Sequence, residues 1–293
     1  MAAKGKITIN AAAISHIGNI RTNNEDNFFL DGQVMAPSDV NAGSRMQTWQ
    51  TDDYHLFAIC DGMGGLEGGE RASWIGVSGL QEIYRPIPEQ EFQESVRRYA
   101  MKATEGVLAD SARNGKNQKE GTTLALLYLR QGTGYTANIG DSRVYLLRKG
   151  CLSQITRDHS MVFQQMLRGE LTREQMRKHP RANAISHYMG MARDRIGENY
   201  IHFTKFDLAQ GDRFLLCSDG LSDMMSFERI EELLSTGDSP MQTAEKLVME
   251  ALELGGKDNT TVLVADVTGE HLRERSVDEL PGLDEEEDSP TAH

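Results

Sequence analysis

Several acidic residues stand beside turn-forming residues at the borders of apolar segments. Asp61 follows FAIC, Asp219 follows FLLCS, and Asp258 comes shortly before TTVLVADV. Each of these acids alone predicts only a turn, because Asp-Gly and Asp-Asn pairs are ordinary turn sequences. Together they indicate more, because strands that lie side by side would bring the three carboxylates to one end of the sheets.

Carboxylates gathered in this way repel one another strongly unless cations lie between them. Mg²⁺ and Mn²⁺ prefer oxygen ligands and would remove that repulsion. We therefore predict that Asp61 bridges two such ions and that the backbone carbonyl of Gly62 is a further ligand. Two ions about 3.5–4 Å apart can hold a hydroxide between them that acts as a nucleophile at neutral pH.

A second acidic segment, RTNNEDN, supplies Glu25, Asp26 and a cation. Arg21 precedes Glu25 by four residues, and a guanidinium can donate two parallel hydrogen bonds to a phosphate. Most arginines in loops are solvated surface residues, but the spacing from the acidic pair favours phosphate binding here. Asp141, in NIGDSR, has a similar turn context.

The composition is that of a soluble globular protein. The 293 residues allow one large domain or two small ones, and 39% of them are hydrophobic. No apolar run approaches the roughly 20 residues that a membrane span needs, and the first ten residues lack the apolar core of a secretory signal. The three cysteines, Cys60, Cys151 and Cys217, predict reduced thiols in a cytoplasmic protein.

The net charge of −13 is distributed unevenly. From Ser276 onward the chain has seven acidic residues and no Lys or Arg, which is more than half of the net charge. We predict one domain over residues 1–269 and a disordered acidic tail over 270–293. The tail could bind a partner, but its composition favours a role in keeping the protein soluble. Without the tail the chain is only mildly acidic, which argues against nucleic-acid binding.

Strand-like segments recur along the chain. They are residues 7–17, 54–60, 124–130, 135–139, 144–148, 214–217 and 261–267. The sequence YTANIGDSRVYLLRKG predicts two strands joined by a tight turn at residues 140–142, and such hairpins indicate antiparallel sheets.

Helical patterns lie between the strands. Residues 89–113 carry an apolar stripe at helical spacing, and a helix is expected from about residue 70 to 84. Ser239-Pro240-Met241-Gln242 has the form of a capping box, and that helix should end at Gly255-Gly256. The polar segment 161–195 has short helical patches and no strand pattern, so we interpret it as an inserted lid.

The order of the motifs resembles one family. RTNNED, DGMGG, GTT, NIGDSR, DHS, SDGL and KDNTTV follow one another as in the metal-dependent protein serine/threonine phosphatases, the PPM or type-2C family, and most closely in its bacterial branch. They cover most of the chain, from Arg21 to Val262. The resemblance implies an α+β fold in which two antiparallel β-sheets form a sandwich flanked by helix pairs, with segment 161–195 as the flap.

The resemblance also implies the activity and the site. The protein would hydrolyse phosphoserine and phosphothreonine on proteins with two Mn²⁺ or Mg²⁺ ions, reverse Ser/Thr kinase signalling, and act as a monomer. Asp61 and the Gly62 carbonyl would bind metal, and Asp219 and Asp258 would hold the first ion. Glu25 would act through water, Asp26 would support the ligands, and Arg21 would bind the phosphoryl oxygens. Hydrogen bonds from Thr122, Thr123, Asn138 and Asp141 would support the site.

Two positions depart from the family pattern. Met63 stands where some members have a histidine that protonates the leaving oxygen, so that proton would come from metal-bound water. Gln118 stands where bacterial members often have an aspartate for a third metal, which argues against a third ion here; Glu120 is a candidate substitute.

Two other functions fit the sequence less well. A non-catalytic relative that only binds or scaffolds is the main alternative, but it would be expected to lack metal-binding acids, and none is missing. A nucleotide-binding transferase could use DGMGGLEGG to bind phosphate, but the glycines lack the G-x-G-x-x-G spacing and no Walker lysine follows.

Overall fold

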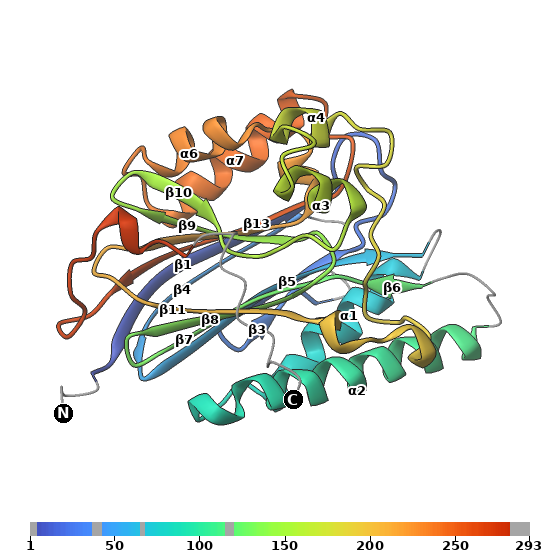
Figure 1. Ribbon diagram of the computed structural model, residues 1–293, viewed down its shortest axis with the longest axis horizontal. Helices are drawn as coiled ribbons and strands as arrows, with labels where there is room; N and C mark the ends of the chain where they lie inside the picture. Colours follow the sequence, from blue (N-terminus) through green and yellow to red (C-terminus); the bar gives the residue numbers. More distant parts are fainter. Residues whose placement is uncertain (1–4, 37–42, 65–67, 115–119, 282–293) are drawn as a thin grey trace.

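The computed structural model describes residues 5–36, 43–64, 68–114 and 120–281. Two antiparallel sheets pack face to face (Figure 1). The first has the strand order β10 (Cys151–Gln154), β9 (Arg143–Arg148), β12 (Arg213–Cys217), β13 (Thr260–Thr268), β1 (Ile7–His16) and β4 (Ser44–Asp52). The second has the order β11 (His202–Asp207), β8 (Thr133–Ile139), β7 (Leu124–Arg130), β5 (Tyr54–Met63), β2 (Asp26–Leu30) and β3 (Gln33–Val34), with β6 (Gly121–Thr122) paired to β5. The predicted sandwich is confirmed.

The space between the sheets is a continuous apolar core. Phe28, Phe57 and Leu127 of the second sheet pack with Leu146 and Leu263 of the first in one buried cluster. Removing this apolar surface from water is the main force that holds the two sheets together. The strand ends, rather than the strand centres, are therefore free to carry polar chemistry.

Helices cover the outer face of each sheet. Helix α1 (Gly69–Gly79) and helix α2 (Phe92–Arg113) pack on the second sheet, and α6 (Phe227–Leu234) and α7 (Pro240–Glu253) pack on the first (Figure 1). The apolar stripe predicted for α2 is the buried one: Phe92, Val96, Tyr99, Ala103 and Val107.

The predicted ends of helix α7 are also confirmed. Ser239 accepts a hydrogen bond from the Gln242 N–H, Gln242 completes the capping box, and Pro240 is the first helical residue. The helix ends at Glu253, just before Gly255 and Gly256, which both have positive φ. Local side-chain chemistry at its two ends therefore sets the length of this helix.

The predicted hairpin over residues 135–148 is wrong. Strand β8 pairs with β7 and β11, whereas β9 belongs to the other sheet and pairs with β10 and β12. Both hydrogen-bonding edges of β8 are thus occupied, and the turn at 140–142 carries the chain from one sheet to the other. The tight hairpins occur instead at Asp31-Gly32, Gln131-Gly132 and Lys149-Gly150, where both residues have positive φ as a type I′ turn requires.

Several strands were not predicted. Strand β4, SRMQTWQTD, is an edge strand that leaves alternate side chains exposed, so its sequence lacks a strong apolar pattern. Strand β2 is fully buried but short and begins at Asp26, within the acidic segment. Strands β10 and β11 were also missed.

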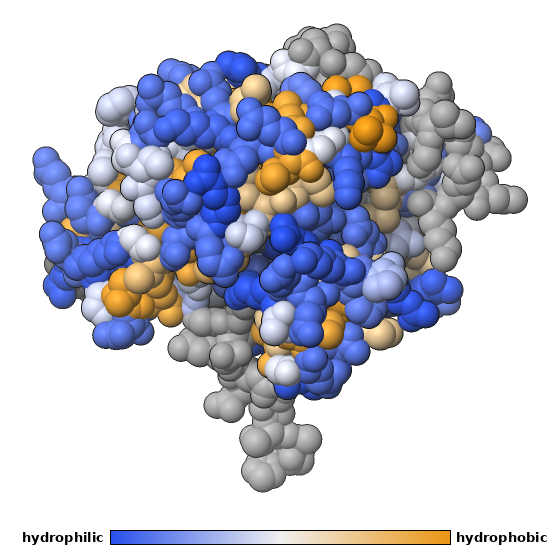
Figure 2. Space-filling view, turned by 90° about the horizontal axis from the view of Figure 1, so that it is seen from above, coloured by the Kyte–Doolittle hydropathy of each residue, from blue (hydrophilic) through white to orange (hydrophobic). Residues whose placement is uncertain are grey.

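Residues 161–195, called the flap segment below, contain helix α3 (Met161–Leu167), helix α4 (Arg173–Arg177) and a short 3₁₀ turn, Arg193–Arg195. Apart from isolated bridges at Ile185 and Met189, this segment contains no strand, as predicted. Helices α3 and α4 of the flap segment lie near α6 and α7, and its later part reaches α2, where the Gly190 N–H donates to Thr104 Oγ1 at 3.4 Å (Figure 1). Seen from the side of α4, α6 and α7, the surface is mostly hydrophilic with separate hydrophobic patches (Figure 2).

The C-terminal segment differs from its prediction. Residues 270–281 were expected in a disordered tail, but Leu272 and Leu280 pack against the core between the sheets. Arg148 donates a hydrogen bond to the Glu279 carbonyl, and a capping box forms between Ser276 and Glu279. The apolar leucines explain why this acidic sequence stays on the body. Residues 282–293 lie outside the described part.

In the described residues, no helix is long and apolar enough to span a bilayer.

Candidate active site

Two carboxylates face each other at the end of the second sheet. Strand β5 continues through Asp61 to Met63, and its register places Asp61 opposite Asp26 of β2. The Ser218 hydroxyl donates to Asp26 Oδ2 at 2.7 Å. Because Ser218 precedes Asp219, this hydrogen bond joins the second sheet to the turn that follows β12 of the first.

The side chain of Asn259 brings the loop of Asp258 to the same place. The Glu25 N–H donates to Asn259 Oδ1 at 2.8 Å. The Asn259 amide in turn donates to the Ile17 and Asn23 carbonyls, each at 2.9 Å. The loop before β13 and the loop before β2 are therefore fixed together, although they lie more than two hundred residues apart in sequence.

Glycines allow three backbone segments to meet beside Asp61. The Gly62 N–H donates to the Glu25 carbonyl at 3.1 Å. A Cβ at Gly62 would lie 2.0 Å from the Gly69 carbonyl oxygen, so no other residue fits there. A Cβ at Gly69 would likewise lie 2.5 Å from the Glu25 carboxyl carbon. Gly65, the last glycine of DGMGG, lies outside the described residues.

The threonines of GTT hold the backbone of Asp61. Thr123 Oγ1 accepts from the Asp61 N–H, and Thr122 Oγ1 donates to the Asp61 carbonyl, both at 2.9 Å. Asn138 donates to the Arg157 carbonyl at 2.8 Å and so orders the chain next to the 140–142 turn. The predicted hydrogen bonds of Thr122 and Thr123 thus reach Asp61, whereas those of Asn138 reach backbone carbonyls near the turn that carries Asp141.

The electrostatics show how closely the carboxylates gather. Burial, followed by the negative charges of Asp26 and Asp219, raises the pKa of Asp61 well above its ordinary value. Burial and the charge of Asp141 do the same to the pKa of Asp219. Burial raises the pKa of Asp26 to about 7, although the hydrogen bond from Ser218 acts in the opposite direction. Asp141 also has its pKa raised to about 7, first by burial.

This donor set fits divalent cations. All of its side chains are oxygen ligands with negative charge, and the buried Asp26 Oδ1 has no hydrogen-bond partner. In the described residues no three such side chains already surround one metal position. The reason is visible at Asp258, whose Oδ1 accepts from the Asn259 N–H and whose Oδ2 pairs with Arg21. The Asp258 carboxylate is thus turned toward protein partners that a cation would replace.

Arg21 lies at the rim of the carboxylate cluster. Its Nη2 is 2.5 Å from Asp258 Oδ2, and half of its side chain is exposed. The hydrogen bond to Asp258, with the charges of Asp258, Glu25 and Asp219, raises the pKa of Arg21. The guanidinium is therefore permanently charged and within reach of both solvent and the acids.

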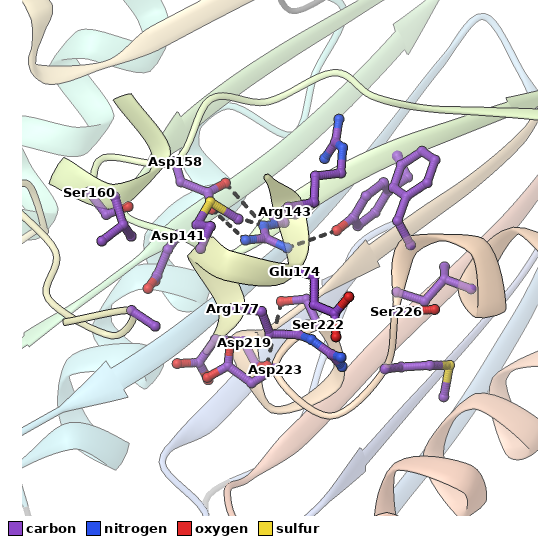
Figure 3. A pocket seen from close by; sticks show the side chains of 18 of the residues that line it. Asp141, Arg143, Asp158, Ser160, Glu174, Arg177, Asp219, Ser222, Asp223 and Ser226 are labelled. Atoms are coloured by element: carbon purple, nitrogen blue, oxygen red, sulfur yellow. Dashed lines mark hydrogen bonds and ion pairs between the residues drawn. The ribbon is translucent and has the colours of Figure 1, made fainter. Parts of the chain in front are cut away.

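A cavity of about 320 Å³ opens beside the cluster. Asp141, Asp219 and Asp223 line it on the side of the carboxylates, and Met176 and Arg177 of α4 line it on the side of the flap segment. Figure 3 shows Asp219 and Asp223 close together and the Arg143 guanidinium turned toward Asp158. Arg143 Nη2 lies 2.6 Å from Asp158 Oδ2, so this arginine is already neutralised.

Sequence reasoning missed Asp223. It follows Asp219 by four residues, which places both on one face of the short helix α5 (Asp219–Ser222) and its last turn. Burial raises the pKa of Asp223, and the charge of Arg143 lowers it. The second Asp of SDGLSD was the available signal. The contact of Arg177 with the Met224 carbonyl gave no local signal, because the two residues lie 47 apart in sequence.

Comparison with known proteins identifies the family. The family model for protein phosphatase 2C matches residues 43–253. The chain belongs to the protein phosphatase 2C family. It is 29% identical over 253 residues to the serine/threonine phosphatase stp of Listeria monocytogenes, covering 85% of this chain and 92% of that protein. It is 34% identical over 266 residues to PstP of Mycobacterium tuberculosis, covering 90% of this chain and 46% of PstP.

Solved structures of bacterial phosphatases have a similar fold. The catalytic domain of PstP in complex with two manganese ions has a TM-score of 0.72 and 30% identity, covering 89% of this chain and 99% of that one. PppA, a key regulatory component of T6SS in Pseudomonas aeruginosa, has a TM-score of 0.70 and 30% identity, covering 88% and 97%. This protein phosphatase 2C is thus a Mn²⁺- or Mg²⁺-dependent hydrolase of phosphoserine and phosphothreonine in proteins.

The structure bears on the two positions that depart from the phosphatase 2C pattern, Met63 and Gln118, and on Glu120, the candidate substitute for Gln118. Met63 ends β5 beside the site and carries no ionisable group. Gln118 lies outside the described residues. Glu120, the candidate substitute, is buried and lies 3.5 Å from Arg71, and its carboxylate occupies the space where a Cβ of Gly68 would stand. The Glu120 carboxylate therefore already has Arg71 as its partner.

Proposed function

We propose that Asp61, the Gly62 carbonyl, Asp219 and Asp258 hold the two cations of this phosphatase, with Glu25 acting through water and Asp26 supporting them. The observation that carries this assignment is the convergence of these acids at one end of the sheets, where burial and neighbouring negative charges raise the pKa values of Asp61 and Asp219. When bound, the two ions supply the positive charge that makes water a nucleophile at neutral pH. That charge also offsets the mutual repulsion of the carboxylates.

Hydrogen bonds hold the backbone around Asp61 in one conformation. Thr122 and Thr123 fix its peptide groups, and the cross-strand position of Asp26 fixes its direction. A ligand held in this way loses little conformational entropy when a cation binds. Ser218 plays a similar part for Asp26, since its hydroxyl holds one carboxylate oxygen and leaves the other free.

Arg21 is the proposed phosphate-binding residue. In the structure its guanidinium satisfies Asp258. We propose that it moves to the substrate phosphoryl group when a cation neutralises Asp258, because the same planar donors match either anion. Its half-exposed position lets it reach a group that enters from solvent.

The broader biological setting is also proposed. The substrates would be proteins phosphorylated by a Ser/Thr kinase, and the flap segment would contribute to their choice because it lines the cavity beside Asp219. The protein would work in the cytoplasm, which the unpaired state of all three cysteines supports. It would work as a monomer, which the scattered single exposures of large apolar residues such as Trp49, Met161 and Met249 support.

Activity measurements on a phosphoserine peptide test the assignment. Chelation should abolish hydrolysis, Mn²⁺ should restore it, and Asp61→Asn should lower kcat by about a thousandfold or more. Glu94→Gln removes an exposed carboxylate on α2 and is the matched control, with unchanged activity expected. Full activity of Asp61→Asn would refute the assignment, and a folded wild-type protein that is inactive with Mn²⁺ would revive the non-catalytic alternative.

A further inference from the structure

A second groove separates the flap segment from the body of the protein. Its volume is about 350 Å³, and it is lined by Leu152 and Gln154 of β10, Met166 and Leu167 of α3, Arg173 of α4, and Phe227 of α6. Its walls belong to two different apolar clusters, a small one inside the flap segment and a larger one beneath α6 and α7. The groove is therefore the seam between the flap segment and the body.

Among the residues that the structure describes, Arg173 in this groove has no carboxylate as a counter-ion. Its guanidinium lies over the Phe227 ring, 4.6 Å from the centroid, and Nη1 donates weakly to Gln154 Oε1 at 3.4 Å. Within residues 5–36, 43–64, 68–114 and 120–281 it forms no ion pair with a carboxylate. A guanidinium stacked on a ring keeps its in-plane N–H groups free for an anion.

The described chain ends beside this groove. The Ser153 hydroxyl donates to the Pro281 carbonyl at 2.9 Å, and Ser153 also lines the groove. Gly282 and Leu283 come next, followed by five consecutive acids, Asp284–Asp288, written DEEED. Two extended residues span at most about 7 Å, so Leu283 and the first acids can reach the groove without rearrangement of the body.

The charges of the two segments are complementary. The flap segment has seven Lys and Arg residues and three acids, a net charge of +4 in a chain whose total is −13. Residues 282–293 have five acids and no Lys or Arg. The acidic run would therefore be attracted to the flap segment and repelled by most of the remaining surface.

We propose that residues 282–288 dock in this groove and strap the flap segment to the body. Leu283 fills the apolar space between Leu152, Met166 and Phe227, and the carboxylates that follow pair with Arg173. The strap holds α4 in place, and α4 also supplies Met176 and Arg177 to the cavity beside Asp219. The acidic tail thus sets how far the flap segment can open, independently of how the metal ligands are assigned.

Cross-linking in the full-length protein tests the contact. The exposed Cys151 is changed to serine, and Leu283→Cys is combined with Met166→Cys, a pair that can form a disulfide with oxidised glutathione only if their Cα atoms approach within about 7 Å. We expect a rapid intramolecular disulfide. Adding Arg173→Glu should slow its formation about fivefold, and the further changes Asp284→Arg and Glu285→Arg should restore the rate.

Hydrogen exchange gives a second readout that needs no catalysis. Changing all five acids of residues 284–288 to amides should speed amide exchange in α3 and α4 by about fivefold, because the flap segment loses its strap. The control Glu91→Gln with Glu94→Gln removes exposed charge on the opposite side, near the start of α2, and should leave this exchange unchanged.

Three results would overturn the proposal. They are a disulfide rate that does not respond to charge at Arg173, exchange in α3 and α4 that does not respond to the tail, and disulfides that form only between two chains. The last would identify a second copy of the protein as the occupant of the groove.

Discussion

The two ends of the β9–β12 strand pair both bury charged side chains, but one end pairs an arginine with an aspartate and the other brings two aspartates together. At one end, Arg148 is the last residue of β9 and Asp212 immediately precedes β12. The two side chains pair through two contacts of 2.8 Å, and both are almost completely buried. At the other end, Asp141 precedes β9 and Asp219 follows β12, and each is an acid. Burial and the charge of Asp141 raise the pKa of Asp219.

The difference separates structure from function. The Arg148–Asp212 pair is completed by protein alone, with Asp212 also accepting from the Ala209 N–H and Arg148 donating to the Asp207 carbonyl. At the Asp219 end, the described arginines nearby already have other partners: Arg21 is half exposed and pairs with Asp258, Arg143 pairs with Asp158, and Arg177 donates to the Met224 carbonyl. A buried charge without a partner is costly, so this end is stable only with cations or bound protons.

The largest expected effect distinguishes the two ends by activity. Asp219→Asn should lower kcat by about a thousandfold, about 4 kcal/mol of transition-state stabilisation. The melting temperature of the metal-free variant should be no lower than that of the wild type, because one repelling charge is gone. Steady-state kinetics and thermal unfolding in chelator measure both. A lowered melting temperature in chelator would show that Asp219 is structural.

Breaking the structural end should give the reverse pattern. Asp212→Asn leaves the buried Arg148 guanidinium without its counter-ion, so the free energy of unfolding should fall by about 3–5 kcal/mol. The activity of each folded molecule should stay close to that of the wild type. Urea denaturation and active-site-normalised rates check this. A large loss of kcat in fully folded protein would contradict the comparison.

Metal binding should stabilise the folded protein through the Asp219 end of the β9–β12 strand pair and not through the Arg148–Asp212 end. At a Mn²⁺ concentration of about one hundred times Kd, the free energy of unfolding should rise by about 2.7 kcal/mol. Asp212→Asn should keep this increment, and Asp219→Asn should lose most of it. Thermal shift titrations of the three proteins provide the measurement, and equal shifts in all three would place the cations elsewhere.

The pH dependence should come from the same end. In chelator, Asp26 and Asp141 have folded-state pKa values of about 7, above the ordinary aspartate value, so the folded protein holds protons that the unfolded chain releases. Stability is therefore greatest near pH 4 and falls as the pH rises toward 7, by up to about 1.4 kcal/mol per pH unit for each group. Mn²⁺ should flatten this dependence. Unfolding in chelator at several pH values measures it, with Asp26→Asn as the variant that removes one group.

Local sequence determined much of the molecule. The strands at 124–130 and 261–267, the buried stripe of α2 and the two ends of α7 follow from apolar periodicity and capping chemistry, which act over a few residues. The acids Asp61, Asp219 and Asp258 stood out because glycine or asparagine beside a carboxylate at the border of an apolar strand is a local signal.

Tertiary structure decided which partners these residues meet. The turn at 140–142 crosses between sheets because β8 has no free edge, and Asp258 faces Arg21 because Asn259 ties two distant loops together. Arg148 pairs with Asp212, and residues 270–281 stay on the body, through contacts between remote segments. Sequence patterns report local backbone preference and burial, whereas long-range hydrogen bonds and ion pairs depend on how the two sheets pack.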